Sequence, residues 1–424
     1  MKRIFILTPI LLLFVTSSYA QKWESIGFNS DFGVYSLLGT ANGLYAGEPN
    51  GIQLWNGTNW TNLGEPSAGA FPLVLTEHNN AVYMGSDYWN LSKRWAVCKY
   101  TANGWARTGG EFSDSQSGVG VSTMLSFNGE LVIGGYLGSY NGGPFMSVAR
   151  FDGTTWHAMG KDVHVRKLVE HNGELYAFGN IARIKRVDHP LADSIIYCAG
   201  KWNGTQWIPL DSSFYKETMT GVSFNGNLVT TWVDHSLQRS VVAKWTGSSF
   251  VPIGGPEIGS VEGFKVFKNE LYVFGTAVLP PNSTYSHVVM KLSGSNWTLV
   301  GSPFNFGVLC LEEYNGHLFA GGYFSKAGND SIKHLAKLNL QPMGIQEQSA
   351  PAMQVYPNPA KGDFTLETSE TGMLHIHNHL GQVVGNYSIE QNSTRIKTDH
   401  LKPGIYVLYL ETDKGRSGVK LVIN

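Results

Sequence analysis

The sequence is poor in charge, and almost none of it has the spacing of an amphipathic helix. Charged residues make up 15% of its 424 residues, and the formal net charge is −1. A chain without an overall basic field lacks the attraction that holds nucleic acid, so we predict no nucleic-acid partner. The lack of helical periodicity argues against helical fold classes and favours an all-β chain of many short strands.

Cysteine is also scarce. The three cysteines, Cys98, Cys198 and Cys310, lie far apart, and an odd number leaves at least one without a disulfide partner. Their spacing matches no metal site. We interpret them as small residues of buried strands, with a disulfide between two of them as the alternative.

The N-terminal hydrophobic run is short. It extends from Ile4 to Val15, follows Lys2 and Arg3, and precedes the small-residue ending Ser18-Tyr19-Ala20. This layout is typical of a secretory signal peptide, here residues 1–20. A membrane anchor is the alternative, but a span needs about 20 apolar residues, so we expect no integral membrane anchor.

Glycine and aromatic residues are abundant, and they recur in a repeating unit. Its clearest copy is residues 127–160, FNGELVIGGYLGSYNGGPFMSVARFDGTTWHAMG. Asn128-Gly129 between apolar runs predicts a hairpin, because both central residues of a type I′ turn need positive φ. The strand after the turn ends in Gly134-Gly135, and a loop, a third strand and a short strand beginning at Trp156 follow. We therefore predict four strands per unit.

The unit recurs with a period of about 43 to 51 residues, which indicates a repeat architecture. Large aromatic residues begin the fourth strands: Trp60, Trp105, Trp156, Trp207, Phe250 and Trp297. Seven second strands begin at Leu44, Val82, Leu131, Leu175, Leu228, Leu271 and Leu318. One fourth strand is therefore missing.

The N-terminus supplies the missing strand. The last repeat stops after the strand 334–339, whereas Trp23-Glu24-Ser25-Ile26-Gly27 matches the fourth-strand pattern of residues 60–64 and has no repeat before it. Pairing this strand into the last repeat would hide two exposed sheet edges. We predict a seven-bladed β-propeller over residues 21–340, closed by the N-terminal strand.

The repeat resembles the kelch-type propeller family, in which a Gly-Gly doublet after an apolar strand is followed by a later aromatic residue and a Trp. The doublet is intact at Gly134-Gly135 and Gly321-Gly322, and Thr230-Thr231 stands in its place in the fifth repeat. The resemblance implies a propeller fold.

Residues 341–352 form a polar linker, and residues 353–424 show short alternating strands typical of a small Ig-like β-sandwich. This segment resembles the type A C-terminal sorting domain of the type IX secretion system, through Tyr356 to Ala360, Gly381, Leu401 to Tyr406 and Lys420 to Ile423. The resemblance implies recognition by that machinery in a Gram-negative bacterium, passage through the periplasm, and release or attachment at the outer cell surface. The sorting residues it implies are Pro357, Asn358, Pro359, Gly404, Tyr406 and Lys420.

His375, His377 and His379 alternate along one strand of this segment. A metal site is one interpretation, but no carboxylate or Cys stands at matching spacing, and a solvated strand face is the simpler one. We predict no metal and no cofactor.

Long loops between second and third strands are the expected place for function, because rigid scaffolds carry their sites on loops. Aromatic and guanidinium groups there suit sugar rings and anionic polymers. The predicted ligand contacts are Tyr88, Trp89, Arg94, Tyr136, Tyr140, Arg183 and Arg186. Simple packing of these loops is the alternative.

These observations predict a monomeric secreted or cell-surface binding protein, whose loops recognise an extracellular glycan or surface polymer. The alternative is a glycosidase or lyase at the mouth of the propeller channel, which would need two nearby carboxylates. We assign no catalytic residue, because the sequence contains no nucleophile elbow, phosphate loop or His-Glu metal motif. Ser194 and Ser331 lie in Asp-Ser-Ile triplets similar to a bacterial O-glycosylation signal.

Overall fold

The computed structural model separates into two compact units: the larger is Ala20–Leu340, and the smaller comprises Gln341–Asn424 together with Met1–Tyr19. All regular elements among the described residues are β-strands, which confirms the all-β prediction. No described segment forms a helix with the length and hydrophobicity that a membrane span needs. The structure describes residues 19–66, 71–88, 96–113, 119–143, 145–160, 164–185, 193–211, 218–234, 236, 239–255, 258–279, 284–342, 353–379, 381–390, 392–412 and 415–424.

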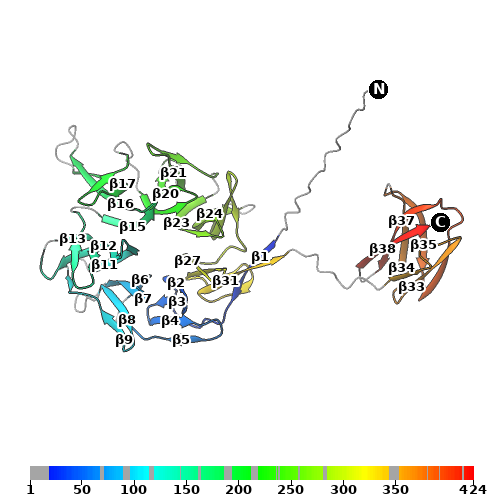
Figure 1. The fold of residues 1–424 in the computed structure, drawn as a ribbon, viewed down its shortest axis with the longest axis horizontal. Helices are drawn as coiled ribbons and strands as arrows, with labels where there is room; N and C mark the ends of the chain where they lie inside the picture. The colour runs from blue at the N-terminus through cyan, green and yellow to red at the C-terminus, as the bar shows by residue number, and fades with distance from the viewer. Residues whose placement is uncertain are drawn as a thin grey trace, which may run out of the picture. The chain divides into compact units, whose positions relative to one another are not determined.

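The larger unit is a propeller-like succession of antiparallel sheets, which follow one another in chain order around a common centre (Figure 1). The first sheet comprises β2 (Ser36–Thr40), β3 (Gly43–Glu48), β4 (Gly51–Trp55) and β5 (Trp60–Asn62). A nine-stranded sheet contains two further runs of four, joined by pairing of β7 with β11. The runs are β6 (Phe71–His78), β7 (Ala81–Tyr88), β8 (Val97–Thr101) and β9 (Gly104–Arg107), then β11 (Val119–Phe127), β12 (Glu130–Tyr140), β13 (Phe145–Phe151) and β14 (Trp156–Ala158), with β10 (Phe112–Ser113) beside β12.

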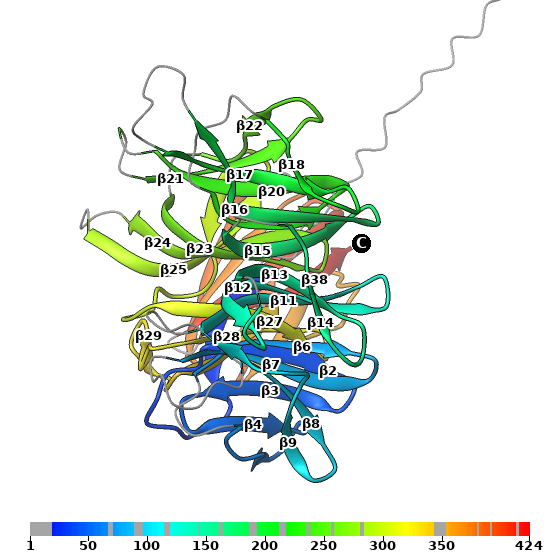
Figure 2. The ribbon, with the colours of Figure 1, turned by 90° about the vertical axis from the view of Figure 1, so that its left-hand side faces the viewer.

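Three more four-stranded sheets continue the series in sequence order, and the hairpin of β24 and β25 projects at one edge of the unit (Figure 2). The first has β15 (His164–His171), β16 (Glu174–Lys185), β17 (Asp193–Trp202) and β18 (Trp207–Pro209). The second has β19 (Thr218–Phe224), β20 (Asn227–Asp234), β21 (Arg239–Trp245) and β22 (Phe250–Pro252). The third has β23 (Ile258–Phe267), β24 (Glu270–Leu279), β25 (Thr284–Ser293) and β26 (Asn296–Leu299).

The last sheet combines both ends of the larger unit. Its order is β1-β31-β28-β27, so the N-terminal strand β1 (Tyr19–Ser25) takes the place of the outer, fourth strand. The predicted pairing of the first strand into the last repeat is therefore present. The remaining strands are β27 (Val308–Tyr314), β28 (His317–Gly322) and β31 (Leu335–Pro342), with a small hairpin of β29 (Lys326–Ala327) and β30 (Asp330–Ser331) between β28 and β31.

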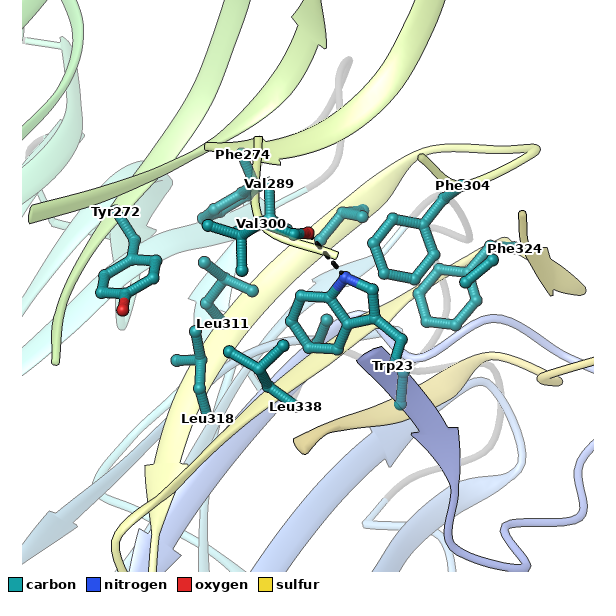
Figure 3. Close-up of a cluster of buried hydrophobic side chains, with 14 of the residues drawn as sticks. Trp23, Tyr272, Phe274, Val289, Val300, Phe304, Leu311, Leu318, Phe324 and Leu338 are labelled. Atoms are coloured by element: carbon teal, nitrogen blue, oxygen red, sulfur yellow. Dashed lines mark hydrogen bonds between the residues drawn. The ribbon is translucent and has the colours of Figure 1, made fainter. Parts of the chain in front are cut away.

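Trp23 fastens this N-terminal strand. Its indole is 1% exposed, lies in a cluster with Phe304 and Phe324, and donates a hydrogen bond from Nε1 to the carbonyl of Val300 at 3.0 Å (Figure 3). Two other fourth strands make the same contact with the sheet before them. The indoles of Trp156 and Trp207 donate to the carbonyls of Thr108 and Met159 at 3.1 and 2.8 Å. The N-terminal strand thus repeats an inter-sheet contact found between consecutive repeats.

The tight turns between first and second strands follow the predicted chemistry. Both central residues have positive φ at Asn128-Gly129, Asn172-Gly173 and Asn225-Gly226. Asn and Gly adopt this conformation more readily than other residues, so these dipeptides close the hairpins.

The Gly doublets allow close approach of neighbouring backbone. A Cβ at Gly135 would lie 2.2 Å from the carbonyl oxygen of Gly120, and one at Gly322 would lie 2.2 Å from that of Gly307. Any side chain would displace the inner strand at these two positions. This close approach explains the doublet that the sequence displays.

The smaller unit contains two sheets around one core. One has the order β32-β33-β36 and the other β35-β34-β37-β38. Phe364 of the first sheet and Leu374, Ile376 and Leu408 of the second are fully buried in the shared cluster. The strands are β32 (Met353–Tyr356), β33 (Asp363–Thr368), β34 (Gly372–His377), β35 (Val383–Ile389), β36 (Ser393–Lys397), β37 (Gly404–Thr412) and β38 (Gly415–Ile423).

The cysteines lie in strands, as predicted. Cys98 is buried in β8, where burial raises the pKa of its thiol to about 12, and Cys310 is half-buried in β27. Cys198 lies in β17, and its side chain is outside the described residues.

Candidate functional site

A cavity of about 310 Å³ lies where the first strands of the repeats meet. Residues of β2, β6, β11, β15, β19, β23 and β27 all line it. Because each of these strands is the first and innermost of its run of four, the cavity lies at the centre of the larger unit.

Irregularities in the inner strands supply several of the lining residues. The ladder shifts by one residue at Ser122 of β11, Arg166 of β15, Glu262 of β23 and Leu309 of β27. Such a bulge leaves one residue out of the ladder and re-aims its side chain. All four line the cavity, so corresponding bulges in different repeats build one site.

Charged side chains of the three inner strands β15, β23 and β27 line this cavity. Arg166, Lys167, Glu262 and Glu312 line it, and Lys265 Nζ donates to Glu312 Oε1 at 2.6 Å. Burial lowers the pKa of Lys167, and nearby Lys265 lowers it further, whereas Glu312 acts in the opposite direction. The cavity therefore combines an ion pair with further cationic and acidic groups that can bind polar ligand atoms.

An aromatic group stands beside the cavity, at the edge where the inner strands begin. The ring of Tyr35 packs edge-on against Phe71 and Tyr323, with centroids 5.8 and 5.5 Å apart. Tyr323 Oη donates to Tyr35 Oη at 2.6 Å, and burial together with this hydrogen bond raises the pKa of Tyr35. Tyr35 lines the cavity, while Tyr323 is 45% exposed. We call Tyr35, Phe71 and Tyr323 the rim aromatics.

The rim aromatics are absent from the contacts that we predicted from the sequence. Tyr35 belongs to the first repeat, Phe71 to the second and Tyr323 to the last, and the closure by β1 brings the first and last sheets together. The predicted closure was the one signal in the sequence that would have directed attention to this junction.

The structure corrects the position of three predicted contacts. Tyr136 and Tyr140 lie in β12, and Arg183 lies in β16, rather than in loops. The hairpins continue past the Gly irregularities, with pairs such as Gly138 with Met146 and Ile184 with Ser194. The loop prediction was wrong there because it took the Gly residues as the end of each strand.

Of the other predicted contacts, one lies at the end of a strand and three lie outside the described residues. Tyr88 ends β7, where it pairs with Val119 of β11. Trp89, Arg94 and Arg186 lie outside the described residues. Tyr136 of β12 pairs with Gly120 on the other side of β11, so the strand β11 lies between Tyr88 and Tyr136.

Tyr140 is held within its own sheet. Its ring lies 5.2 Å from that of Phe112, and its hydroxyl accepts a hydrogen bond from the backbone N–H of Gly110 at 3.0 Å. These contacts anchor β10 and the turn before it to the β12–β13 hairpin.

The histidines of the smaller unit have local partners. His375 Nδ1 lies 2.7 Å from Asn386 Oδ1, and His377 Nδ1 lies 3.1 Å from the carbonyl of Gly381. In the part of the chain that the structure describes, no group of three or more His, Cys, Asp or Glu side chains could hold a metal ion.

The sorting landmarks come together in space. The amide of Asn358 donates to the carbonyl of Lys420 at 2.6 Å, and its oxygen accepts the N–H of Val422 at 2.9 Å. Ala360 adds a hydrogen bond to Val422 and one from Asn424. The Pro-Asn-Pro-Ala segment and the closing strand, some 60 residues apart, therefore form one structural feature.

Tyr406 belongs to the same core. It is 8% exposed, and its hydroxyl donates to the carbonyl of Lys402 at 2.8 Å. This bond ties the Leu-Lys-Pro-Gly turn to the strand β37.

Residues 354–424 match the family model of the secretion system C-terminal sorting domain. The match confirms the sorting domain, and it indicates type IX export with a secreted or cell-surface location in Bacteroidetes. A sorting domain of this kind implies interaction with the type IX machinery. No curated protein matches the chain.

Solved structures with a similar arrangement include PorZ, an essential bacterial surface component of the type IX secretion system of Porphyromonas gingivalis. It is 14% identical with a TM-score of 0.45, and the match covers 94% of this chain but only 60% of that protein. YCF48 from Cyanidioschyzon merolae is 8% identical with a TM-score of 0.47, covering 76% of this chain and 100% of that one. The computationally designed protein Ika8 is 11% identical with a TM-score of 0.43, covering 93% and 97%.

Proposed function

We propose that a cleaved signal peptide and the sorting domain deliver a seven-bladed, kelch-like propeller, residues 21–340, to the cell exterior, where it binds a glycan. Four-stranded runs that follow one another in chain order support the propeller, and the Trp23 contact supports its closure. The two-sheet core supports an Ig-like module at residues 353–424.

The rim aromatics beside the charged cavity carry the binding proposal. Sugar rings have apolar faces that stack on aromatic side chains and polar edges that take hydrogen bonds. The exposed ring of Tyr323 provides a stacking surface, and Arg166, Lys167 and Glu262 provide hydrogen-bonding groups in the cavity that its partner Tyr35 also lines. A cavity of about 310 Å³ is at the lower end of the usual range for ligand pockets, about 300 to 1,000 Å³, which suits one sugar unit of a longer chain.

We propose that contacts predicted from the sequence extend the binding surface beyond the rim aromatics. The ends of second strands and the starts of first strands lie at the same edge of each antiparallel sheet, so Tyr88, Tyr136 and Arg183 belong to the edge that carries the rim aromatics. We retain these three, with Trp89, Arg94 and Arg186, as proposed outer contacts for a polymer. Tyr140 lies within its sheet against Phe112, and we retain it as a further proposed contact.

The enzyme alternative rests on the cavity's two carboxylates, Glu262 and Glu312. A glycosidase needs one carboxyl group that holds a proton at working pH. Glu312 Oε1 is already engaged in an ion pair with Lys265 Nζ, which does not favour that role.

Tyr323→Ala should weaken glycan binding by about three- to tenfold, the loss expected when one aromatic stacking contact is removed. The mature protein would first be screened against soluble polysaccharides, and the variant titrated with the best binder. Tyr285→Ala is the matched control, because Tyr285 is also exposed but is not one of the rim aromatics. Equal losses in both variants, or none in Tyr323→Ala, would place the site elsewhere.

We also propose that Ser194 and Ser331 are O-glycosylated. Ser331 is exposed in β30, whereas Ser194 lies in β17 and its side chain is outside the described residues. We expect the native secreted protein to be heavier than its bare polypeptide. An intact mass equal to that of the polypeptide would exclude modification.

A further inference from the structure

Every repeat contributes to the wall of the cavity at the centre of the larger unit. The lining residues come from all of the innermost strands, β2, β6, β11, β15, β19, β23 and β27. A buried hydrophobic cluster fills each junction between consecutive runs of four strands, and Figure 3 shows one of these clusters. In the described part of the unit, a ligand can therefore reach the cavity only along the axis around which the sheets follow one another.

An ion pair narrows this axis toward the tight turns. Glu312 lines the cavity and also a second hollow of about 510 Å³, which Lys265 and the turn residue Asn315 line as well. Lys265 Nζ donates to Glu312 Oε1 at 2.6 Å, and the two side chains are only 23% and 20% exposed. The charges of both groups act on Lys167, which lines the cavity from β15. We call Lys167, Lys265 and Glu312 the floor of the cavity.

The rim aromatics stand at the other end of the axis. Tyr35 lines the cavity just before β2 begins, and its partner Tyr323 is 45% exposed. Lys265 and Glu312 instead lie close to the ends of β23 and β27, where the tight turns follow. A ligand therefore enters past the rim aromatics and stops at the floor.

Three bulge residues extend into the space between rim and floor. Ser122, Arg166 and Glu262 are exposed to solvent although they belong to innermost strands. All three line the cavity, so the solvent that they reach there is the solvent of the cavity. A bulge directs its side chain out of the regular ladder, and here it directs polar groups at whatever occupies the cavity.

The wall has an apolar side as well as a polar side. Leu73 of β6 and Leu309 of β27 also lie at shifts of the ladder and line the cavity. They belong to the second and last repeats, which together with the first repeat supply the rim aromatics. Ser122, Arg166 and Glu262 come from the third, fourth and sixth repeats. A sugar ring with its apolar face toward the leucines would present its hydroxyl groups to these polar side chains.

The shape of the cavity restricts which unit of a glycan it can hold. Its volume of about 310 Å³ suits a single sugar unit. A unit in the middle of a chain continues in two directions and needs two exits. The junction clusters close the sides and the floor narrows the far end, so only the rim gives the rest of the chain room to leave.

We propose that the cavity binds the terminal sugar unit of a glycan chain or branch, which enters along the axis past the rim aromatics. The protein then recognises chain ends and not internal units. This inference rests on the glycan binding proposed above, and it specifies which part of the glycan is bound. The units next to the end lie over the rim, where the ring of Tyr323 is exposed.

Size fractions of the linear polysaccharide that binds best in the screen test this inference. They would be titrated into the mature protein at equal molar concentrations of chains. A linear chain has one end of each kind whatever its length, so the affinity per chain should be the same for short and long fractions. If internal units were bound, the affinity per chain would rise with the number of units.

Ser122→Trp should weaken binding of every fraction by at least about tenfold, because an indole would fill space that the terminal unit needs. Ser122 is exposed, so the melting temperature should stay close to that of the wild type. Glu262→Ala is a smaller change of the same wall and should weaken binding about threefold or more. Glu170→Trp is the matched control: Glu170 is exposed at the tight-turn end of β15, and the affinity should stay unchanged.

Two results would overturn end recognition and leave glycan binding at the rim intact. One is an affinity per chain that rises in proportion to chain length. The other is wild-type affinity in both Ser122→Trp and Glu262→Ala while Tyr323→Ala binds weakly. Failure of the wild-type protein to bind any polysaccharide in the screen would overturn the proposed function itself, and end recognition with it.

Discussion

A chain that ends at Pro342 should fold but be at least tenfold depleted from the medium and the cell surface. The larger unit has its own sheets and its own cores, so loss of the sorting domain leaves its packing intact. The domain that the type IX machinery recognises is then absent. Immunoblots of medium, surface and cell fractions, with a melting curve of the purified truncated protein, measure both expectations.

Asn386→Ala is a matched control for this experiment. It removes the partner of His375 within the sorting domain but touches none of the sorting landmarks, so export should stay normal. Normal surface levels of the truncated chain would show that residues 343–424 are not needed for export.

Trp23→Ala should destabilise the larger unit by about 3 to 5 kcal/mol, the usual loss when a buried tryptophan is truncated. The indole is 1% exposed and bonds to Val300, so both packing and a hydrogen bond disappear. The edge of β31 should then become available for pairing with other molecules. Guanidinium unfolding measures the first effect, and light scattering measures the second.

Trp105→Ala is the control, because Trp105 occupies the same place in the second repeat but is half-buried and its Nε1 has no described partner. We expect a smaller loss and no self-association. An unchanged unfolding midpoint in Trp23→Ala would contradict the closure by β1.

The repeat itself was predictable from local chemistry. Asn128-Gly129 indicated a hairpin because few other residues tolerate its backbone, and Gly135 indicated a close approach that the structure places at 2.2 Å from Gly120. The orphan strand at Trp23 was predictable because it lacked its own repeat. In each case the signal lies in a short segment.

The candidate sites were less predictable because they depend on residues from different repeats. β12 and β16 continue beyond their Gly residues. If the Gly residues are taken as the ends of the strands, the sequence that follows resembles a loop. The bulges at Arg166 and Glu262 shift the hydrogen-bond ladder, but no characteristic residue type in the sequence indicates a bulge there.

Hydrogen exchange of the mature protein, with and without saturating amounts of the best-binding polysaccharide, tests the central claim that the larger unit binds a glycan at the rim of its cavity. Bound ligand should protect peptides that contain Tyr35 to Leu37, Phe71 to Leu75 and Val308 to Leu311, because these segments form the rim and the adjoining cavity wall. Protection confined to the tight turns at Asn128, Asn172 and Asn225, or no protection within residues 20–340, would contradict it.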